Sequence, residues 1–422
     1  MVREYKDSGI TWIGRIPQDW NTTKLGSLYT QRNEKVSDKD YAPLSVTMQG
    51  ILPQLETAAK TDDGDNRKLV KKGDFAINSR SDRRGSCGIS PYDGSVSLIN
   101  TILKPRGEMN PNFYNWLFHT SPFADEFYKW GHGIVDDLWT TRWQEMKNIS
   151  VVIPSLEEQQ HIADYLDKKC AEIDGLIELQ EQMIAQLTDY KQSVITEAVT
   201  KGLNPNVEFV PSGVDWIGDV PKGWKVCRIK DIFRLRTGTT PKDFETGLDS
   251  SELVNWFTPS DVAEMNCELN CSERHLSKAV VEKEGIELSP AGSLIFVGIG
   301  ASAGKIGYAT VQGYSNQQIT TLIPKPSKCT GKYSYYYMIA DRKRIRDNAF
   351  FTTLPIINNS YLSGIKTLLP SLEEQTSIAS FLDKKCNEID ELITAKQKKI
   401  ETLKEYKKSV IFEAVTGKIE IE

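Results

Sequence analysis

Residues 155–200 read SLEEQQHIADYLDKKCAEIDGLIELQEQMIAQLTDYKQSVITEAVT, and this stretch organises the rest of the chain. Residues 371–416 read SLEEQTSIASFLDKKCNEIDELITAKQKKIETLKEYKKSVIFEAVT. With the preceding proline included, 29 of 47 aligned positions are identical. An internal repeat of this length sets the architecture of the whole chain.

Both copies are predicted to form one long helix. Ser155 and Ser371 each follow a proline and precede a glutamate by three positions, which predicts an N-cap with a capping box. No proline interrupts either copy. At ~1.5 Å per residue, an unbroken helix of this length would extend roughly 65 Å.

Apolar residues recur in both copies at near-heptad spacing, which is typical of a coiled-coil seam. We expect the two helices to pair through Leu166, Cys170, Ile173, Ile177, Ile184, Leu187 and Val194, and through Leu382, Cys386, Ile389, Ile393, Ile400, Leu403 and Val410. Polar residues interrupt the seam at matching places, namely Gln180, Lys191, Lys396 and Lys407. Such polar seam positions can fix register and the choice of partner.

Two partners could cover this seam. The two copies can pair with each other inside one chain, where their effective concentration is high. A homodimeric coiled coil between two chains is the alternative. We favour the intrachain pair, because two near-identical helices are already joined by one polypeptide.

A second pair of matched segments shows that the whole chain is a duplication. Residues 4–20 read EYKDSGITWIGRIPQDW, and residues 208–224 read EFVPSGVDWIGDVPKGW. Each copy therefore has a lead-in, a globular block and a long helix. We predict that the lead-in tryptophans anchor a core, with stacking on DNA as the alternative: Trp12, Trp20, Trp216 and Trp224.

The globular blocks, roughly 22–153 and 226–369, resemble each other far less. Both contain short apolar runs punctuated by Gly and Pro, which predicts β-structure with some helix. Residues 73–78 (GDFAIN) correspond to residues 292–297 (GSLIFV), so we expect one shared scaffold. We predict an α+β fold with domains at 1–154, 155–202, 203–370 and 371–422, in which the second and fourth are the helices.

Charge is distributed unevenly along the 422 residues, whose formal net charge is −5. Residues 155–199 hold 3 basic and 10 acidic side chains, and residues 371–415 hold 8 and 9. The helices thus carry −8 and the remainder +3, which permits nucleic-acid binding without indicating it. Seven scattered cysteines, no secretory signal and no apolar run of ~18 residues predict free thiols, a cytoplasmic location and no membrane partner.

These residues together resemble a known family. The Pro-Ser-Leu-Glu-Glu-Gln start, the Asp-Lys-Lys stretch, the Tyr-Lys-x-Ser-Val-Ile-x-Glu-Ala-Val-Thr end and the Ser-Gly-x-x-Trp-Ile-Gly lead-in are similar to the specificity subunit of type I restriction-modification systems, called HsdS. The resemblance covers the chain from end to end, in the family's order of recognition domain, helix, recognition domain, helix.

The resemblance implies a binding subunit with no catalytic centre of its own. Each target-recognition domain would read one half of a bipartite, asymmetric sequence in double-stranded DNA. The two helices would lie antiparallel, set the spacing of the half-sites and dock two methyltransferase subunits. S-adenosylmethionine, ATP and Mg²⁺ are expected on partner subunits only, which can include two motor-nuclease subunits. A coiled-coil scaffold that binds only proteins is the alternative.

Candidate DNA contacts in the variable blocks are chosen by their chemistry. Arginines suit phosphates and guanine edges, and amides suit adenine edges. The first block offers Arg80, Arg83, Arg84, Thr140, Thr141 and Arg142. The second block offers Arg234, Arg236, Thr239, Thr240, Lys305, Asn316, Gln317, Gln318, Asn358 and Asn359. The alternatives are solvated surface loops for the cationic residues and buried, backbone-bonded amides for the others.

Three other signals are weak. Residues 300–306 (GASAGKI) resemble a phosphate-binding loop, but one spacer residue is missing and Ile306 replaces the Mg²⁺-binding hydroxyl. Cys267, Cys271 and His275 offer only three zinc ligands. Asp137, Glu145 and Lys147 could mimic a nuclease cluster, but no second such set exists. We therefore predict no metal, no nucleotide and no enzymatic activity in this chain.

Overall fold

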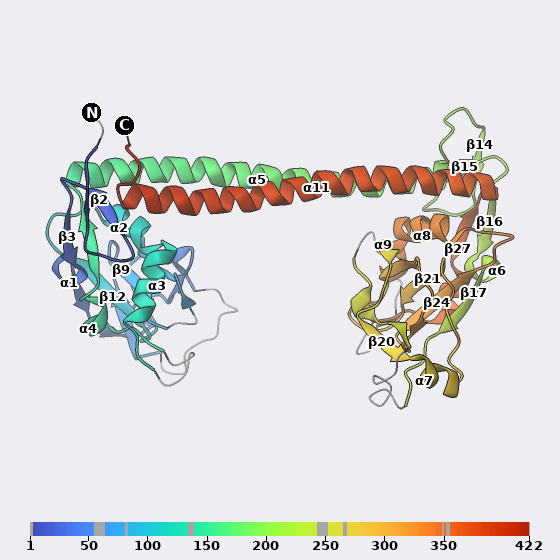
Figure 1. The fold of residues 1–422 in the computed structure, drawn as a ribbon, viewed down its shortest axis with the longest axis horizontal. Helices are drawn as coiled ribbons and strands as arrows, with labels where there is room; N and C mark the ends of the chain where they lie inside the picture. Colours follow the sequence, from blue (N-terminus) through green and yellow to red (C-terminus); the bar gives the residue numbers. More distant parts are fainter. Residues whose placement is uncertain are drawn as a thin grey trace. The chain divides into compact units, whose positions relative to one another are not determined.

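The computed structural model describes residues 3–54, 64–80, 83–133, 139–242, 252–264, 268–347, 350–351 and 355–421. The chain divides into two compact units (Figure 1). Unit 1 comprises residues 1–181 and 397–422, and unit 2 comprises residues 182–396. Each unit therefore contains one lead-in, one globular block and part of both long helices.

Unit 1 is built from short strands, the four short helices α1 to α4, and part of each of the two long helices. Its main sheet has the strand order β10-β9-β12-β4, and a three-stranded sheet has the order β11-β8-β5. The elements are β1 (Tyr5–Asp7), β2 (Arg15–Pro17), β3 (Asn21–Lys24), α1 (Leu25–Leu28), β4 (Tyr29–Arg32), β5 (Lys35–Val36), β6 (Leu44–Thr47), β7 (Gly50–Pro53), β8 (Arg67–Val70), β9 (Phe75–Asn78), β10 (Cys87–Ile89), β11 (Gly94–Val96), β12 (Asn100–Pro105), α2 (Pro111–Phe118), α3 (Ser121–Lys129), α4 (Trp143–Met146), β13 (Ser150–Ile153) and the first part of α5 (Leu156–Lys201).

Unit 2 repeats this arrangement with a longer main sheet. Its strand order is β17-β24-β21-β22-β19, and a three-stranded sheet has the order β20-β18-β23. The elements are β14 (Phe209–Pro211), β15 (Asp219–Pro221), β16 (Lys225–Arg228), α6 (Ile229–Ile232), β17 (Phe233–Thr237), β18 (Leu253–Phe257), β19 (Glu268–Leu269), β20 (Arg274–Ser277), α7 (Lys278–Lys283), β21 (Leu294–Val297), β22 (Ile306–Ala309), β23 (Tyr314–Ser315), β24 (Ile319–Pro324), α8 (Gly331–Ala340), α9 (Arg342–Asp347), β25 (Phe350–Phe351), β26 (Pro355–Ile356), α10 (Asn359–Gly364), β27 (Lys366–Leu369) and α11 (Leu372–Val415).

The segments matched in the sequence occupy matching places in the two units. Residues 73–78 lead into β9, which pairs antiparallel with β10. Residues 292–297 lead into β21, which pairs antiparallel with β22. On their other edges, β9 pairs with β12 and β21 pairs with β24, both antiparallel. The prediction of one shared α+β scaffold is therefore confirmed.

The two long helices run antiparallel within unit 1. Apolar residues near the start of α5 pack in one core with residues near the end of α11, namely Ile162, Leu166 and Cys170 with Val410, Ala414 and Val415. Across the same pair, the Lys407 ammonium donates to the Asp174 carboxylate at 2.7 Å. The helices therefore pair inside one chain, as the sequence favoured.

Unit 2 contains the same contact with the two helices exchanged. Residues near the end of α5 share a core with residues near the start of α11, namely Ile195, Ala198 and Val199 with Ile378, Ala379, Leu382 and Cys386. The Lys191 ammonium donates to the Asp390 carboxylate at 2.6 Å. Lys191 and Lys407 are the matching polar interruptions of the seam, and both find a carboxylate on the opposite helix.

The predicted pairing residues are buried or half-buried along both helices. Eight of the fourteen are buried, whereas Ile177, Ile184, Leu187, Val194, Ile393 and Leu403 are half-buried. A pair of helices without further cover exposes the flanks of its seam, which explains the partial burial.

The helix starts follow the prediction only in part. The backbone N–H of Glu158 donates to Ser155 Oγ, and that of Glu374 donates to Ser371 Oγ, both at 3.2 Å. The Glu158 carboxylate, however, accepts the indole N–H of Trp20 at 2.7 Å. The glutamate therefore does not close the capping box. It ties the helix to the lead-in, where Trp20 is fully buried as predicted.

Each globular block is fastened to its long helix by repeated side-chain contacts. Gln159 Oε1 accepts the backbone N–H of Asn110, and Gln375 Oε1 accepts that of Thr330, both at 2.9 Å. These contacts give a structural role to the glutamine of the duplicated Glu-Glu-Gln motif. In the described part of the chain, no helix has the length and low charge needed to cross a membrane. The cysteines there are free thiols.

Candidate DNA-recognition faces

The fold of unit 1 brings its two predicted clusters together. Arg80 and Thr140 form an antiparallel β-bridge, although 60 positions separate them in the sequence. Beside it, the backbone N–H of Thr141 donates to the carbonyl of Ser79 at 3.0 Å. The loop after β9 and the segment before α4 therefore form one surface.

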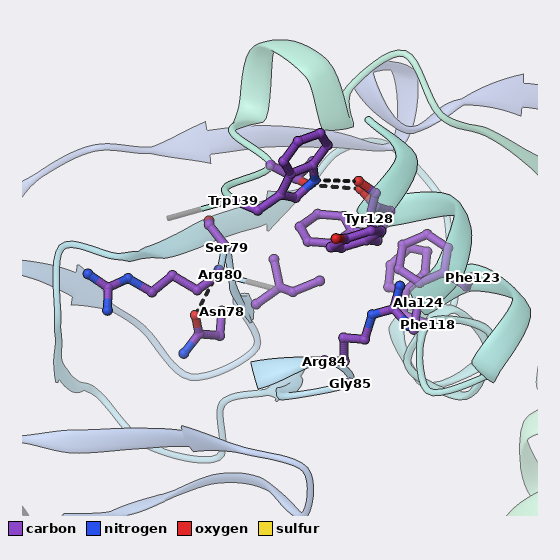
Figure 2. A pocket seen from close by; sticks show the side chains of 13 residues that line it. Asn78, Ser79, Arg80, Arg84, Gly85, Phe118, Phe123, Ala124, Tyr128 and Trp139 are labelled. Atoms are coloured by element: carbon purple, nitrogen blue, oxygen red, sulfur yellow. Dashed lines mark hydrogen bonds between the residues drawn. The ribbon is translucent and has the colours of Figure 1, made fainter. Parts of the chain in front are cut away.

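An aromatic-lined cavity lies beneath this surface (Figure 2). The Arg84 guanidinium lies 4.3 Å from the centre of the Tyr128 ring, and the rings of Tyr128 and Trp139 are 5.5 Å apart. The Trp139 indole N–H donates to the carbonyl of Tyr128 at 2.9 Å. The cavity encloses about 20 Å³, and Phe118 and Phe123 line its inner wall. Arg84 thus places a planar cation over the Tyr128 ring, beside the tilted ring of Trp139.

Exposure separates the unit 1 candidates into two groups. Thr141 is 2% exposed, and its hydroxyl donates to the carbonyl of Phe127 at 2.8 Å, so it supports the fold. The exposed candidates are Arg80, Arg83, Arg84 and Arg142. Arg84 also pairs with Asp125 at 3.2 Å, but both side chains are about half exposed, so this pair is weak. We call Arg80, Arg84, Arg142, Tyr128 and Trp139 the unit 1 face.

A second hollow of unit 1 adjoins this face. It has about 320 Å³ of space and is lined by Gln31, Lys68, Arg142 and Gln144, among others. The Lys68 ammonium donates to the carbonyl of Asn100 at 2.7 Å, and burial lowers its pKa. Amide and cationic groups here surround a space of the size that a base edge could enter.

The fold of unit 2 brings most of its amide candidates to one end of β17 and β24. The Thr240 hydroxyl donates to Gln317 Oε1, and Asn316 Nδ2 donates to Gln318 Oε1 at 3.1 Å. Asn359 Nδ2 donates to Thr237 Oγ1 at 2.8 Å, and its Oδ1 accepts from Thr320 at 2.6 Å. We call Thr240, Asn316, Gln317, Gln318 and Asn359 the amide network. Thr239 adjoins it, since its backbone N–H donates to the carbonyl of Ser315 at 2.8 Å.

The arginines of β17 are engaged by an acidic neighbour. Glu287 Oε2 accepts from Arg234 at 2.5 Å and from Arg236 at 2.9 Å. The hydrogen bond from Arg236 and the charge of Arg234 hold the pKa of Glu287 below its usual range. Arg236 also donates to Ser289 Oγ. These two cations are therefore balanced in part within the unit.

Asn358 and Lys305 lie apart from the amide network's hydrogen bonds. Asn358 Oδ1 accepts the backbone N–H of Tyr361 at 2.8 Å and so caps α10. Lys305 lies 3.6 Å from the Glu264 carboxylate.

Sequence reasoning missed a third feature nearby, the basic helix α9, whose residues read RKRIRD. The run of like charge from Arg342 to Arg346 was the signal that could have identified it.

The structure places some residues of the three weak motifs, which are the loop of residues 300–306, the possible zinc ligands and the possible nuclease cluster. Residues 300–306 form the turn between β21 and β22. Asp137 and Cys267 lie outside the described residues. The Lys147 ammonium donates to Gln144 Oε1 at 2.7 Å. Among the residues that the structure describes, no group of three metal-binding side chains occurs.

Comparison with known proteins gives a consistent family. The model of the type I restriction modification DNA specificity domain matches residues 17–189 and again residues 221–402. The type I restriction enzyme MjaVIII specificity subunit of Methanocaldococcus jannaschii is 25% identical over 97% of this chain and 95% of its own length. The putative type I restriction enzyme MjaX specificity subunit of the same organism is 23% identical, over 100% of this chain and 99% of its own.

Solved structures show the same fold. A chain described in work on complex assembly and conformational transition of the type I R-M system matches with a TM-score of 0.74, covering 96% of this chain and 99% of that one at 15% identity. The HsdS subunit from Thermoanaerobacter tengcongensis matches with a TM-score of 0.54 at 16% identity, covering 96% and 98%. The duplicated domain model spans most of the chain, so this protein belongs to the type I restriction-modification specificity subunits and provides DNA sequence specificity.

Proposed function

We propose that units 1 and 2 each read one half of a bipartite, asymmetric DNA site. The observation that carries this proposal is one repeated scaffold with two chemically different faces. Arginines beside aromatic rings suit guanine edges and phosphates, whereas amides suit adenine edges. Two different readers on one chain would select an asymmetric sequence with more affinity than either reader alone.

The test of this proposal exchanges one reader. The first globular block, residues 22–153, is replaced by the equivalent block of another specificity subunit, and the chain is expressed with its methyltransferase. Methylome sequencing should then show one changed half-site and one unchanged half-site. If both half-sites stay unchanged, recognition does not reside in this block.

We further propose that the long helices set the spacing between the half-sites. Inserting four residues after Gln180 would lengthen α5 by ~6 Å, about one turn. The target should then acquire a different spacer or be lost. An unchanged target in the methylome would show that the spacing is set elsewhere.

Two methyltransferase subunits are the partners that we propose for the helices. In unit 1, Leu176 and Tyr406 are 47% and 49% exposed. In unit 2, Leu392 and Tyr190 are 51% and 53% exposed. Each pair combines a leucine of one helix with a tyrosine of the other. We call these pairs the apolar pairs.

The geometry of the seam supports docking at the apolar pairs. The Asp174–Lys407 contact puts Leu176 and Tyr406 at the same level of unit 1. Both hold the same heptad position, so in an antiparallel pair they flank the seam on the same side. Because the equivalent pair recurs in unit 2, two copies of one partner would find equivalent sites.

Stoichiometry tests this docking. Leu176→Asp and Leu392→Asp should each leave one methyltransferase bound, and the double variant should bind none. Native mass spectrometry of the purified complex counts the copies. Loss of both copies in either single variant would contradict two independent docking sites.

We propose that the chain itself carries out no chemistry. S-adenosylmethionine would be held by the methyltransferase subunits, and ATP and Mg²⁺ by two motor-nuclease subunits where these are present. Turnover of DNA by the purified chain alone, with Mg²⁺ or methyl donor, would overturn this part. If the chain were a scaffold that binds proteins but no DNA, exchanging residues 22–153 would leave the methylated sequence unchanged.

A further inference from the structure

The basic helix α9 borders a large hollow within unit 2. This hollow has about 890 Å³ of space and is lined on one side by Gln192 and Thr196 of α5. Arg342, Lys343 and Arg346 line it from α9. We call these residues, together with Lys305 and Glu264, the basic groove. It contains four cationic side chains and the Glu264 carboxylate, and Asp347 lines it as a second acidic residue.

Glu264 is the point on which the cations converge. Arg342 donates to its carboxylate and to its backbone carbonyl. Lys305 lies 3.6 Å from one carboxylate oxygen, and Arg346 lies 4.0 Å from the other. The hydrogen bond from Arg342 holds the pKa of Glu264 below its usual range, so the carboxylate is charged at neutral pH. One anion therefore faces three cations inside a hollow.

The turn of residues 300–306 builds this arrangement. Gly304 adopts φ +88°, and a side chain there would collide with Cγ of Arg346. Without a Cβ, Gly304 lets the stem of Arg346 cross the turn, and Lys305 follows directly beside it. The segment that only resembled a phosphate-binding loop in the sequence thus brings two cations together by another route.

Arg344 shows that α9 is held in place by its opposite side. It pairs with Asp341, which is 2% exposed, and its guanidinium lies 5.5 Å from the centre of the Trp216 ring. These contacts tie α9 to the lead-in of unit 2. Arg344 therefore serves the fold, while Lys343 remains exposed toward the hollow.

We propose that the basic groove binds a backbone phosphate of the DNA, and that the Glu264 carboxylate occupies the phosphate position until DNA arrives. Guanidinium groups match the oxygens of a phosphate, and a backbone phosphate carries one negative charge, as does the carboxylate that it would displace. Gln192 and Thr196 can donate further hydrogen bonds from α5. This inference rests on the proposed function, because it assumes that unit 2 contacts DNA.

The groove would add affinity without sequence information, since phosphates are the same at every position. Glu264 would then weaken binding to any duplex, whether or not it contains the target, because the phosphate must first displace an internal partner. Removing a cation and removing the carboxylate should therefore have opposite effects on binding to random DNA.

The test uses the full chain assembled with its methyltransferase and two duplexes, one with the target from methylome sequencing and one of random sequence. Lys343→Gln and Arg346→Gln should each weaken binding to both duplexes by roughly fivefold and lower the salt slope by about 0.9. Glu264→Gln should tighten binding to the random duplex by a similar factor. Lys225→Gln removes an exposed cation of unit 2 outside the groove and should change neither quantity.

The outcomes separate the two proposals. If the parent complex methylates and binds its target but both cation variants bind as tightly as the parent, the groove proposal is wrong and the proposed function stands. If these variants lose methyltransferase and not DNA, the groove binds an acidic protein segment instead. Weaker binding by Glu264→Gln would overturn the role of the carboxylate. If the parent binds neither duplex, both proposals fall.

Discussion

Unit 1 places an arginine against two tilted aromatic rings at its candidate face, whereas unit 2 places amide and threonine side chains there that hydrogen-bond to one another in small groups. The strands beneath these faces are the same, since β9 and β10 correspond to β21 and β22. The contacts that fasten each block to its helix are also the same, through Gln159 and Gln375. The difference teaches that the duplication preserves the scaffold and the helix attachment, while the exposed loops vary.

Substitutions at equivalent residues of the two units test whether the scaffold is shared and the faces differ. If scaffold contacts are shared, matched substitutions in the two units should lower the free energy of unfolding by different amounts only where the burial of the two residues differs. If recognition is local to each unit, substitutions on the faces should affect DNA binding unequally.

The lead-in tryptophans should show the largest difference in stability. Trp20 is fully buried and donates to Glu158, whereas Trp224 is only half-buried. Trp20→Ala should lower the free energy of unfolding by ~3–5 kcal/mol, and Trp224→Ala by about 2 kcal/mol. Urea unfolding of the full chain measures both. Trp20→Phe serves as control, since it keeps most of the apolar area. Equal losses at both positions would show that burial does not decide their roles.

The two ion pairs across the helices give the next comparison. The Lys191 side chain is 2% exposed, whereas that of Lys407 is 25% exposed. Asp390→Ala leaves the buried Lys191 without its carboxylate and should cost about 3 kcal/mol of stability. Asp174→Ala leaves Lys407 near water and should cost about 1 kcal/mol or less. Thermal unfolding of the two variants tests the difference, and a reversed order would contradict it.

The helices and their pairing could be predicted from the sequence because their signals are local and periodic. The serine caps, the seam and the lysine interruptions all follow from residue spacing. The fate of Glu158 could not be predicted, because it depends on Trp20, which lies 138 positions away. The capping box therefore failed at the residue that a distant element recruits.

The candidate faces were predictable by residue type but not by arrangement. A single β-bridge joins Arg80 to Thr140, and such a contact cannot be predicted from the spacing of residues in the sequence. Glu287 balances Arg234 and Arg236 from a different segment, so the sequence overstated how much free charge β17 presents. The basic residues of α9 are visible in the sequence. Their position beside a hollow that also contains Glu264 could be found only from the structure.

The arginines of the two faces should differ in their effect on DNA binding. Arg84 is paired only weakly with Asp125, whereas Arg234 shares Glu287 with Arg236. Arg84→Gln should weaken binding of the target duplex about tenfold, or about 1.4 kcal/mol. Arg234→Gln should weaken it by about twofold or less, because Glu287 already offsets its charge. Fluorescence anisotropy of the methyltransferase complex measures both affinities. A stronger effect of Arg234→Gln would mean that DNA displaces Glu287.

The helix caps should show no difference between the units. Ser155 and Ser371 accept their backbone N–H groups at the same distance of 3.2 Å, and each follows a proline at the start of a long helix. Ser155→Ala and Ser371→Ala should each cost ~1 kcal/mol, since both leave one helix N–H without its side-chain acceptor. Ser→Asp at each position should preserve stability, because a carboxylate also caps and suits the helix dipole. Urea unfolding of the four variants measures these changes. A cost at one cap more than about twice that at the other would mean that the two starts are not equivalent, and that the lead-in contact of Glu158 stabilises the first helix in a way that the second does not share.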